Sequence, residues 1–171
     1  VGVLTVPAEQ VAELMADGDT RWIHRGAYDL MGVDPEAVGS AAGLPKARAL
    51  YGSLPEQMAD PHSYARRLQA LLTVREQYRI FQARQVAVPD VQAQSLLVMV
   101  HELPGDFGTQ VTALNFSAQR VAEEVPIAGV QPGSRVRDML GDKALGQLTQ
   151  NGTLSVTLDP YEGMSYLVLN D

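Results

Sequence analysis

The 171-residue sequence predicts an α+β chain, in which a loop-and-helix segment precedes an antiparallel β-sandwich of seven or eight strands. Three observations predict this order. Residues 63–81 place apolar side chains at helical spacing, later segments alternate apolar and polar residues, and turns rich in Pro, Gly and Asn separate them. The pattern changes at Arg84, so we predict two parts, residues 1–84 and 85–171.

Residues 1–60 are predicted to be mostly irregular, with two short ordered pieces. Residues 1–6 fit a strand or an extended entry segment, and residues 8–16 have the apolar spacing of a short helix that follows Pro7. Residues 19–60 combine many Gly and Pro residues with many apolar and aromatic ones. Long ordered loops of this kind often line functional sites, and a flexible linker is the alternative.

A helix is predicted next, with Asp60 as its N-cap and Pro61 as its first helical residue. Its apolar residues recur with a period near that of an α-helix, namely Tyr64, Leu68, Leu71, Leu72, Tyr78 and Phe81. We expect this stripe to pack into a core, with Arg75 at the surface or in an ion pair.

The rest of the chain is predicted to form strands. The expected segments are 86–91, 96–103, 109–116, 121–127, 135–140, 145–148, 153–158 and 164–169. Pro89 suggests an edge position for the first of them. Segments 96–103 and 109–116 are expected to form a hairpin, and Asn151-Gly152 is the strongest turn signal, joining 145–148 to 153–158. In 153–158 apolar and polar residues alternate, so one face is predicted to be buried.

Composition excludes several classes of function. The formal net charge of −7 disfavours binding to nucleic acid or to anionic membrane surfaces. There is no cysteine, which excludes disulfides and thiolate zinc sites and fits a reducing cytoplasm. No apolar run reaches the ~18 residues needed to span a bilayer.

No catalytic residue, metal site or cofactor is predicted. The three histidines lie far apart and do not form a zinc-protease pattern, and neither a phosphate loop nor a hydrolase nucleophile elbow occurs. Glycoside chemistry needs two facing carboxylates, and no pair is indicated by spacing. Asp138, Asp142 and Asp159 follow strands, where an Asx turn is the ordinary explanation.

One loop has the composition of a sugar-binding surface. Residues 19–29 combine charges, an imidazole and two aromatic rings, and the candidate substrate-binding residues are Arg21, Trp22, His24 and Arg25. Aromatic faces can stack on sugar rings and guanidinium groups can bind hydroxyls. A purely structural role of this loop is equally compatible with its residues.

Two blocks, 18–30 and 47–57, resemble the trehalose synthases, which are maltose α-D-glucosyltransferases of the α-amylase superfamily. Segments 114–117, 138–141 and 158–163 are similar to motifs in the C-terminal sandwich of that superfamily. The Arg-Trp-x-His-Arg pattern at 21–25 is also similar to amylosucrase-type glucosyltransferases, which remain the alternative.

The resemblance implies that this chain is the non-catalytic C-terminal portion of an enzyme that interconverts maltose and trehalose. The chain starts at Val1 without an initiator Met, which fits the tail of a longer protein. The catalytic carboxylates would lie in a missing (β/α)8 barrel, residues 61–81 would be its last helix, and Arg21 would help to close the sugar pocket. Maltose or trehalose and that barrel are the implied partners.

Two other interpretations remain. In an interaction domain, helix surface normally covered by the barrel would become available, so that a homo-oligomer is a further expectation. A carbohydrate-binding module would need an exposed aromatic platform on the sandwich. Because Phe116 and Tyr166 lie in apolar strands, we expect both in the core, which disfavours the module.

Overall fold

A computed structural model describes residues 2–3, 30–32, 48–49 and 51–169 of the chain. The chain divides into two compact units, residues 1–69 and 70–171, and each is described by itself. The domain boundary predicted after residue 84 remains a prediction. In the first unit β1 (Gly2–Val3) pairs antiparallel with β2 (Arg48–Ala49), and the helix predicted over 8–16 lies outside the described residues.

Helix α2 (Leu54–Ala59) begins with a capping box. The Ser53 hydroxyl accepts a hydrogen bond from the Glu56 amide, and the Glu56 carboxylate accepts one from the Ser53 amide at 2.7 Å. The Ser53 hydroxyl also donates to the Glu56 carboxylate at 2.9 Å, and the two hydrogen bonds from the Ser53 amide and hydroxyl lower the pKa of Glu56. The buried Gln57 side chain donates to the Gly52 carbonyl at 3.1 Å and accepts from the Ala65 amide at 3.3 Å, so it joins α2 to the next helix.

Helix α3 (Tyr64–Gln77) begins three residues later than the sequence predicts. Asp60 does not cap it, because its carboxylate accepts from the His62 amide instead. The Ser63 hydroxyl accepts from the Arg66 amide at 3.2 Å and takes the capping role. Beyond Gln77 the left-handed Arg79 (φ 50°) interrupts the helix, and a 3₁₀ turn η1 (Ile80–Gln82) follows.

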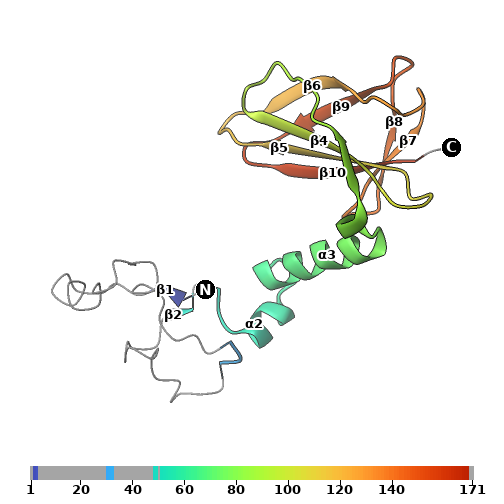
Figure 1. Cartoon of the computed structure of the whole chain (residues 1–171). Coiled ribbons are helices and arrows are strands. Elements are labelled where there is room, and N and C mark those ends of the chain that lie inside the picture. Colours follow the sequence, from blue (N-terminus) through green and yellow to red (C-terminus); the bar gives the residue numbers. More distant parts are fainter. Residues whose placement is uncertain (1, 4–29, 33–47, 50, 170–171) are drawn as a thin grey trace, which may run out of the picture. The chain divides into compact units, whose positions relative to one another are not determined.

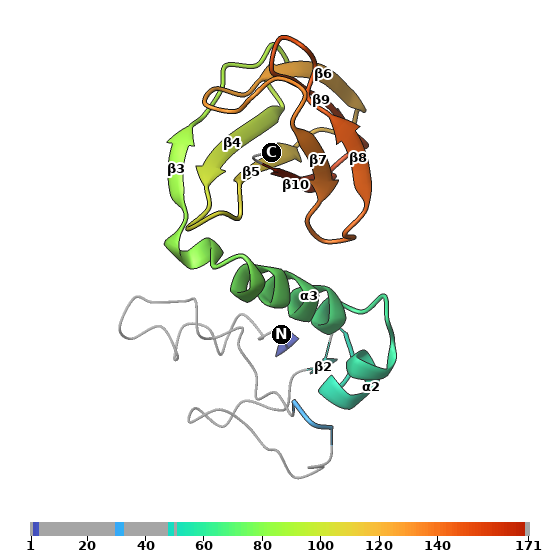
Figure 2. The same cartoon turned by 90° about the vertical axis from the view of Figure 1, so that its right-hand side faces the viewer.

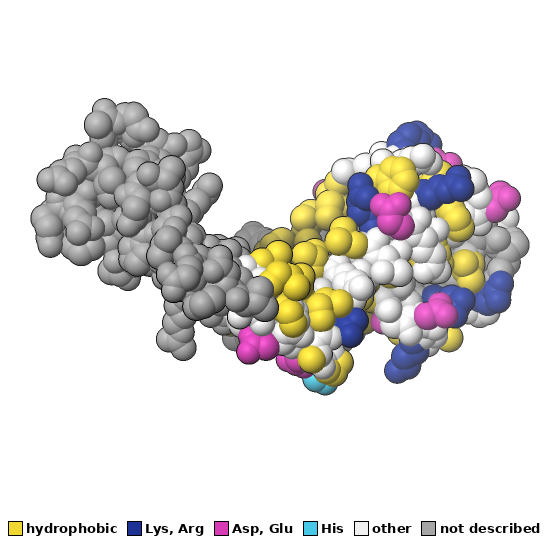
Figure 3. All heavy atoms as spheres, turned by 90° about the horizontal axis from the view of Figure 1, so that it is seen from below, with side chains coloured by type: hydrophobic (Ala, Val, Ile, Leu, Met, Phe, Trp, Pro, Cys, Tyr) yellow, Lys and Arg dark blue, Asp and Glu magenta, His cyan; other side chains and the backbone are white. Residues whose placement is uncertain are grey.

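The prediction that the apolar stripe of this helix packs into a core is wrong for most of its members. Between 42% and 59% of each of these residues is exposed: Tyr64, Leu68, Leu71, Leu72 and Phe81. Figure 3 shows hydrophobic side chains gathered at the surface of the helical segment. Tyr78 instead packs, with Val74, against a small cluster of Leu103, Met139 and Leu167. Arg75 lies at the surface, where it pairs with Glu76 at 2.9 Å, as expected.

The second unit contains eight antiparallel strands in two sheets, which confirms the predicted sandwich (Figure 1). The strands are β3 (Arg84–Ala87), β4 (Leu96–Glu102), β5 (Thr109–Asn115), β6 (Val121–Pro126), β7 (Arg135–Asp138), β8 (Ala144–Gln147), β9 (Thr153–Leu158) and β10 (Gly163–Val168). One sheet has the order β3-β4-β5-β10-β7-β8, and β6 pairs with β9 in the other. Figure 2 shows β3 and β8 at opposite edges of the larger sheet.

Alternating apolar residues of both sheets form the core. In β9, Leu154, Val156 and Leu158 are buried while Ser155 and Thr157 are exposed, as the sequence predicts. These side chains pack in one cluster with the inward residues of the larger sheet, among them Leu96, Val98, Val100, Val111, Ala113, Val136, Tyr166 and Val168. The two-stranded sheet therefore covers one face of the six-stranded sheet.

The turn predicted at Asn151-Gly152 is present, and the Gly152 amide donates to the Thr149 carbonyl at 2.9 Å. Gly152 has a φ of 70°, which suits glycine. However, β8 pairs with β7 and β9 pairs with β6, so the turn carries the chain from one sheet to the other. The hairpin of β4 with β5 is confirmed along its whole length.

The two aromatic residues assigned to the core behave differently. Tyr166 is buried, whereas 64% of Phe116 is exposed, so the prediction for Phe116 is wrong. The inward positions of β5 are Val111, Ala113 and Asn115, which places the next residue on the opposite side. Phe116 also lies just beyond the strand, where its amide donates to the Ser95 carbonyl.

Candidate functional site

The residues that the sequence nominates for substrate binding are Arg21, Trp22, His24 and Arg25. All four lie outside the described residues, so their role remains a prediction. Among the described residues, no group of three or more His, Asp or Glu side chains is arranged to hold a metal ion. The described part of the chain also contains no helix long and apolar enough to cross a membrane.

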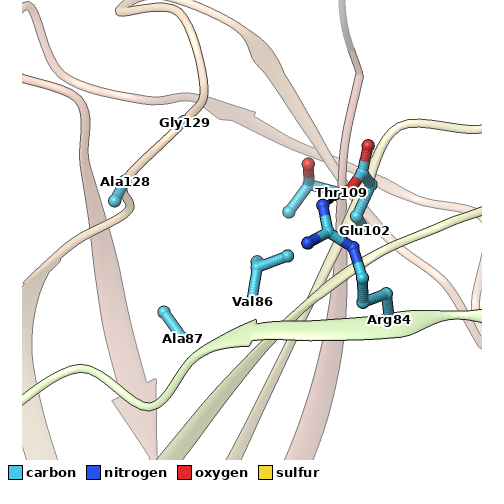
Figure 4. Close-up of a pocket in the computed structure, with 7 residues that line it drawn as sticks. All are labelled: Arg84, Val86, Ala87, Glu102, Thr109, Ala128 and Gly129. Atoms are coloured by element: carbon cyan, nitrogen blue, oxygen red, sulfur yellow. Dashed lines mark hydrogen bonds and ion pairs between the residues drawn. The ribbon is translucent and has the colours of Figure 1, made fainter.

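A cleft of about 340 Å³ lies at the edge of the larger sheet (Figure 4). The strand register aligns Arg84 of β3 with Glu102 of β4, and Glu102 with Thr109 of β5. Glu102 stands two residues after Val100 and therefore lies on the core-facing side of the sheet. Val86 and Ala87 extend the wall along β3, and Ala128-Gly129 form the opposite side in the loop after β6.

An ion pair between Arg84 and Glu102 dominates the chemistry of this cleft. Their side chains are 75% and 57% exposed, so water screens the pair and its contribution to stability is small. Of the described residues lining the cleft, only Glu102 carries a carboxylate, and the Arg84 guanidinium engages it. A retaining or inverting glycosidase needs two carboxylates across the bond. This cleft therefore offers hydrogen-bonding groups for a ligand rather than that catalytic pair.

A second cleft, of about 400 Å³, belongs to the first unit. Its lining residues are Tyr51, Asp60, His62, Ser63, Tyr64 and Arg67. The rings of Tyr51 and Tyr64 stack with their centroids 5.5 Å apart and their planes at 14°. Each tyrosine is more than half exposed, so this stack is available to solvent.

Of the three acidic residues predicted to form Asx turns at strand ends, Asp138 does so, whereas the carboxylates of Asp142 and Asp159 lie in exposed ion pairs. The Asp138 carboxylate accepts from the Leu140 amide at 2.9 Å, which is an Asx turn. Asp142 pairs with Arg137 at 2.7 Å on an exposed surface.

Sequence comparison identifies no relative: no family model and no curated protein matches the chain. Several solved structures of carbohydrate-active enzymes are distantly similar. An Anoxybacillus α-amylase is 12% identical with a TM-score of 0.49, and the match covers 61% of this chain and 22% of the amylase. A β-L-arabinopyranosidase from Geobacillus stearothermophilus is 21% identical with a TM-score of 0.44, over 58% of this chain and 23% of that one.

A third similar structure is a mutant of MUTB from crystals soaked with trehalulose. It is 16% identical with a TM-score of 0.44, and the match covers 68% of this chain and 20% of that protein. The matches thus span about a fifth of each of these three proteins. At this identity and TM-score the similarity assigns no family.

Proposed function

We propose that this chain is a non-catalytic β-domain with a preceding helical segment, of the kind found at the C-terminus of carbohydrate-active glycosidases. More specifically, we propose that it belongs to an enzyme that interconverts maltose and trehalose by intramolecular glucosyl transfer. The observation that carries the proposal is the order of elements, in which α3 and the short 3₁₀ turn η1 precede an eight-stranded antiparallel sandwich. The resemblance of blocks 18–30 and 47–57 to trehalose synthases supports the finer assignment.

In the proposed parent enzyme, a barrel carboxylate attacks the anomeric carbon of maltose and forms a glucosyl-enzyme with release of glucose. The glucose stays in the pocket, turns, and accepts the glucosyl group on its own anomeric hydroxyl, which gives trehalose. Water must be kept out, because it would otherwise hydrolyse the intermediate. Arg21, with Trp22, His24 and Arg25, is proposed to help close that pocket.

The proposal is tested in the complete enzyme with Arg21→Ala. We expect kcat for conversion of maltose to trehalose, followed by chromatography, to fall about tenfold or more without a change in melting temperature, because the open pocket would hold the glucose less well and admit water. Arg137→Ala is the matched control: Arg137 lies on β7 of the sandwich, where it pairs with Asp142 at 2.7 Å, and its loss should leave kcat unchanged. Unchanged kinetics of Arg21→Ala would remove its assigned role.

The isolated chain provides the second arm of this test. Incubated with maltose, it should form no trehalose, since the barrel is proposed to carry the reacting carboxylates. Formation of trehalose by the isolated chain at a rate near that of an intact enzyme would refute the non-catalytic assignment.

A further inference from the structure

Two exposed aromatic residues lie on adjoining loops at one end of the sandwich. Phe116 follows β5 and is 64% exposed, and Tyr161, in the turn between β9 and β10, is 72% exposed. The Tyr161 amide donates to the Ser117 carbonyl at 3.1 Å, and the Asn115 amide donates to the Glu162 carbonyl at 2.9 Å. The two loops are therefore held side by side by their own backbones.

The backbone of Tyr161 is in a conformation that tyrosine rarely adopts. It is the third residue of a tight turn in which the Glu162 amide donates to the Asp159 carbonyl, and its φ is 57°. Glycine or asparagine ordinarily occupies this position, because a larger side chain is strained there. A strained residue that also holds its ring in solvent indicates a role in binding rather than in packing.

The same two loops carry polar groups of both signs. The Arg120 guanidinium and the Asp159 carboxylate lie 3.7 Å apart, and their side chains are 69% and 73% exposed. A sugar ring presents an apolar C–H face and an edge of hydroxyls, which match an aromatic face beside donors and acceptors. Two side chains are too small an area for a stable protein interface, and the net charge of −7 opposes nucleic acid.

We propose that Phe116 and Tyr161 form a carbohydrate-contact site on the sandwich, with Arg120 and Asp159 bonding to sugar hydroxyls. A carbohydrate-binding module was disfavoured because Phe116 was expected in the core, and the observed exposure of Phe116 removes that argument. The ligand class is a neutral oligosaccharide, and the choice of an α-linked glucan rests on the function proposed above. This site is distinct from the cleft around Arg84 and Glu102.

The site is tested by titrating the chain with maltoheptaose and following the backbone amide resonances by NMR. We expect the largest shifts in residues 115–120 and 159–162. Phe116→Ala and Tyr161→Gly should each raise Kd about three- to tenfold, the range for loss of one aromatic contact. Tyr161→Gly is the decisive variant, because glycine relieves the backbone strain and preserves the turn, so that weaker binding cannot be ascribed to unfolding.

Leu145→Ala is the control, since Leu145 is an exposed apolar residue of β8 and is not part of this turn. This variant should bind maltoheptaose with the same Kd as the unaltered chain. Absence of binding, or equal binding by Tyr161→Gly and the unaltered chain, would overturn the site. The two proposals fail separately. If the complete enzyme makes trehalose but the isolated C-terminal chain does not bind maltoheptaose, only this site is refuted. If the isolated chain binds maltoheptaose but the complete enzyme makes no trehalose, only the proposed function is refuted.

Discussion

A single buried amide organises the end of the sandwich that carries the proposed sugar site. Asn115 is 3% exposed, and its Nδ2 donates to the carbonyls of Gln119 and Asp159 at 2.7 and 2.9 Å. Its Oδ1 accepts from the amide and the hydroxyl of Ser117 at 3.0 and 2.9 Å. Asn115 thus connects the loop that carries Phe116 to the turn that carries Tyr161.

Asn115→Ala removes these four hydrogen bonds at a buried position. We expect a loss of about 2–4 kcal/mol in the free energy of unfolding, measured by urea denaturation. Ser117→Ala, which removes only one hydroxyl, should lose about 1 kcal/mol or less. Equal losses in the two variants would contradict the central role of the asparagine.

Because of Tyr166, the stability of the β-domain should fall at alkaline pH. Burial, followed by the charges of Glu162 and Asp138, raises the pKa of Tyr166 to about 12 from the usual 10. The folded state therefore holds this proton more tightly than the unfolded state. The corresponding stabilisation is complete below pH 10 and is lost as the pH rises from 10 to 12.

The melting temperature of the chain should accordingly fall between pH 10 and 12. In Tyr166→Phe, which keeps the ring in the core but cannot ionise, this fall should be smaller. Tyr161→Phe is the control, because it removes the hydroxyl of an exposed tyrosine and leaves the buried Tyr166 in place. Identical pH profiles for Tyr166→Phe and the unaltered chain would contradict the assignment.

At the scale of elements, the strands were the most predictable part of the chain. Strands in which apolar and polar residues alternate strongly, such as β5 and β9, begin and end within one or two residues of the sequence prediction. The alternation indicates directly which face of the strand is buried. The start of α3 was misplaced because Asp60 and Ser63 both suit an N-cap, and local sequence does not decide between them.

Sheet membership and the cleft could not be predicted in the same way. The turn at Asn151-Gly152 is local, whereas the pairing of β9 with β6 depends on residues about thirty positions away in the sequence. The cleft unites β3, β4, β5 and the loop after β6, and only the observed register brings Arg84, Glu102 and Thr109 into one row.

The buried core of the sandwich and its edge strand β8 should differ sharply in their sensitivity to mutation. Leu158 of β9 is fully buried in the cluster shared by both sheets, while Leu145 of the edge strand β8 is 40% exposed. Leu158→Ala should lower the free energy of unfolding by about 2–5 kcal/mol through the cavity that it leaves. Leu145→Ala should change it by less than about 0.5 kcal/mol. A similar cost at both positions would mean that β9 does not anchor the core.

For the whole molecule, the decisive physical feature is apolar surface on α3 that coexists with an overall negative charge. Leu71 and Leu72 are each about half exposed, and exposed apolar patches favour association with another surface. The net charge of −7 opposes association of two copies, and salt screens that repulsion. In the proposed parent enzyme, the barrel would cover this helix.

The isolated chain should therefore bind a hydrophobic dye such as ANS. Its self-association, measured by sedimentation velocity, should strengthen as the salt concentration rises from about 0.05 to 0.5 M, because the screening length then shrinks to a few ångströms. The double variant Leu71→Ser with Leu72→Ser should weaken both signals, because it removes the apolar surface without touching the sandwich core. Leu140→Ser, at an exposed position of the β-domain, should leave both unchanged. A monomer that binds no dye at any salt concentration would show that the exposed leucines of α3 need no partner.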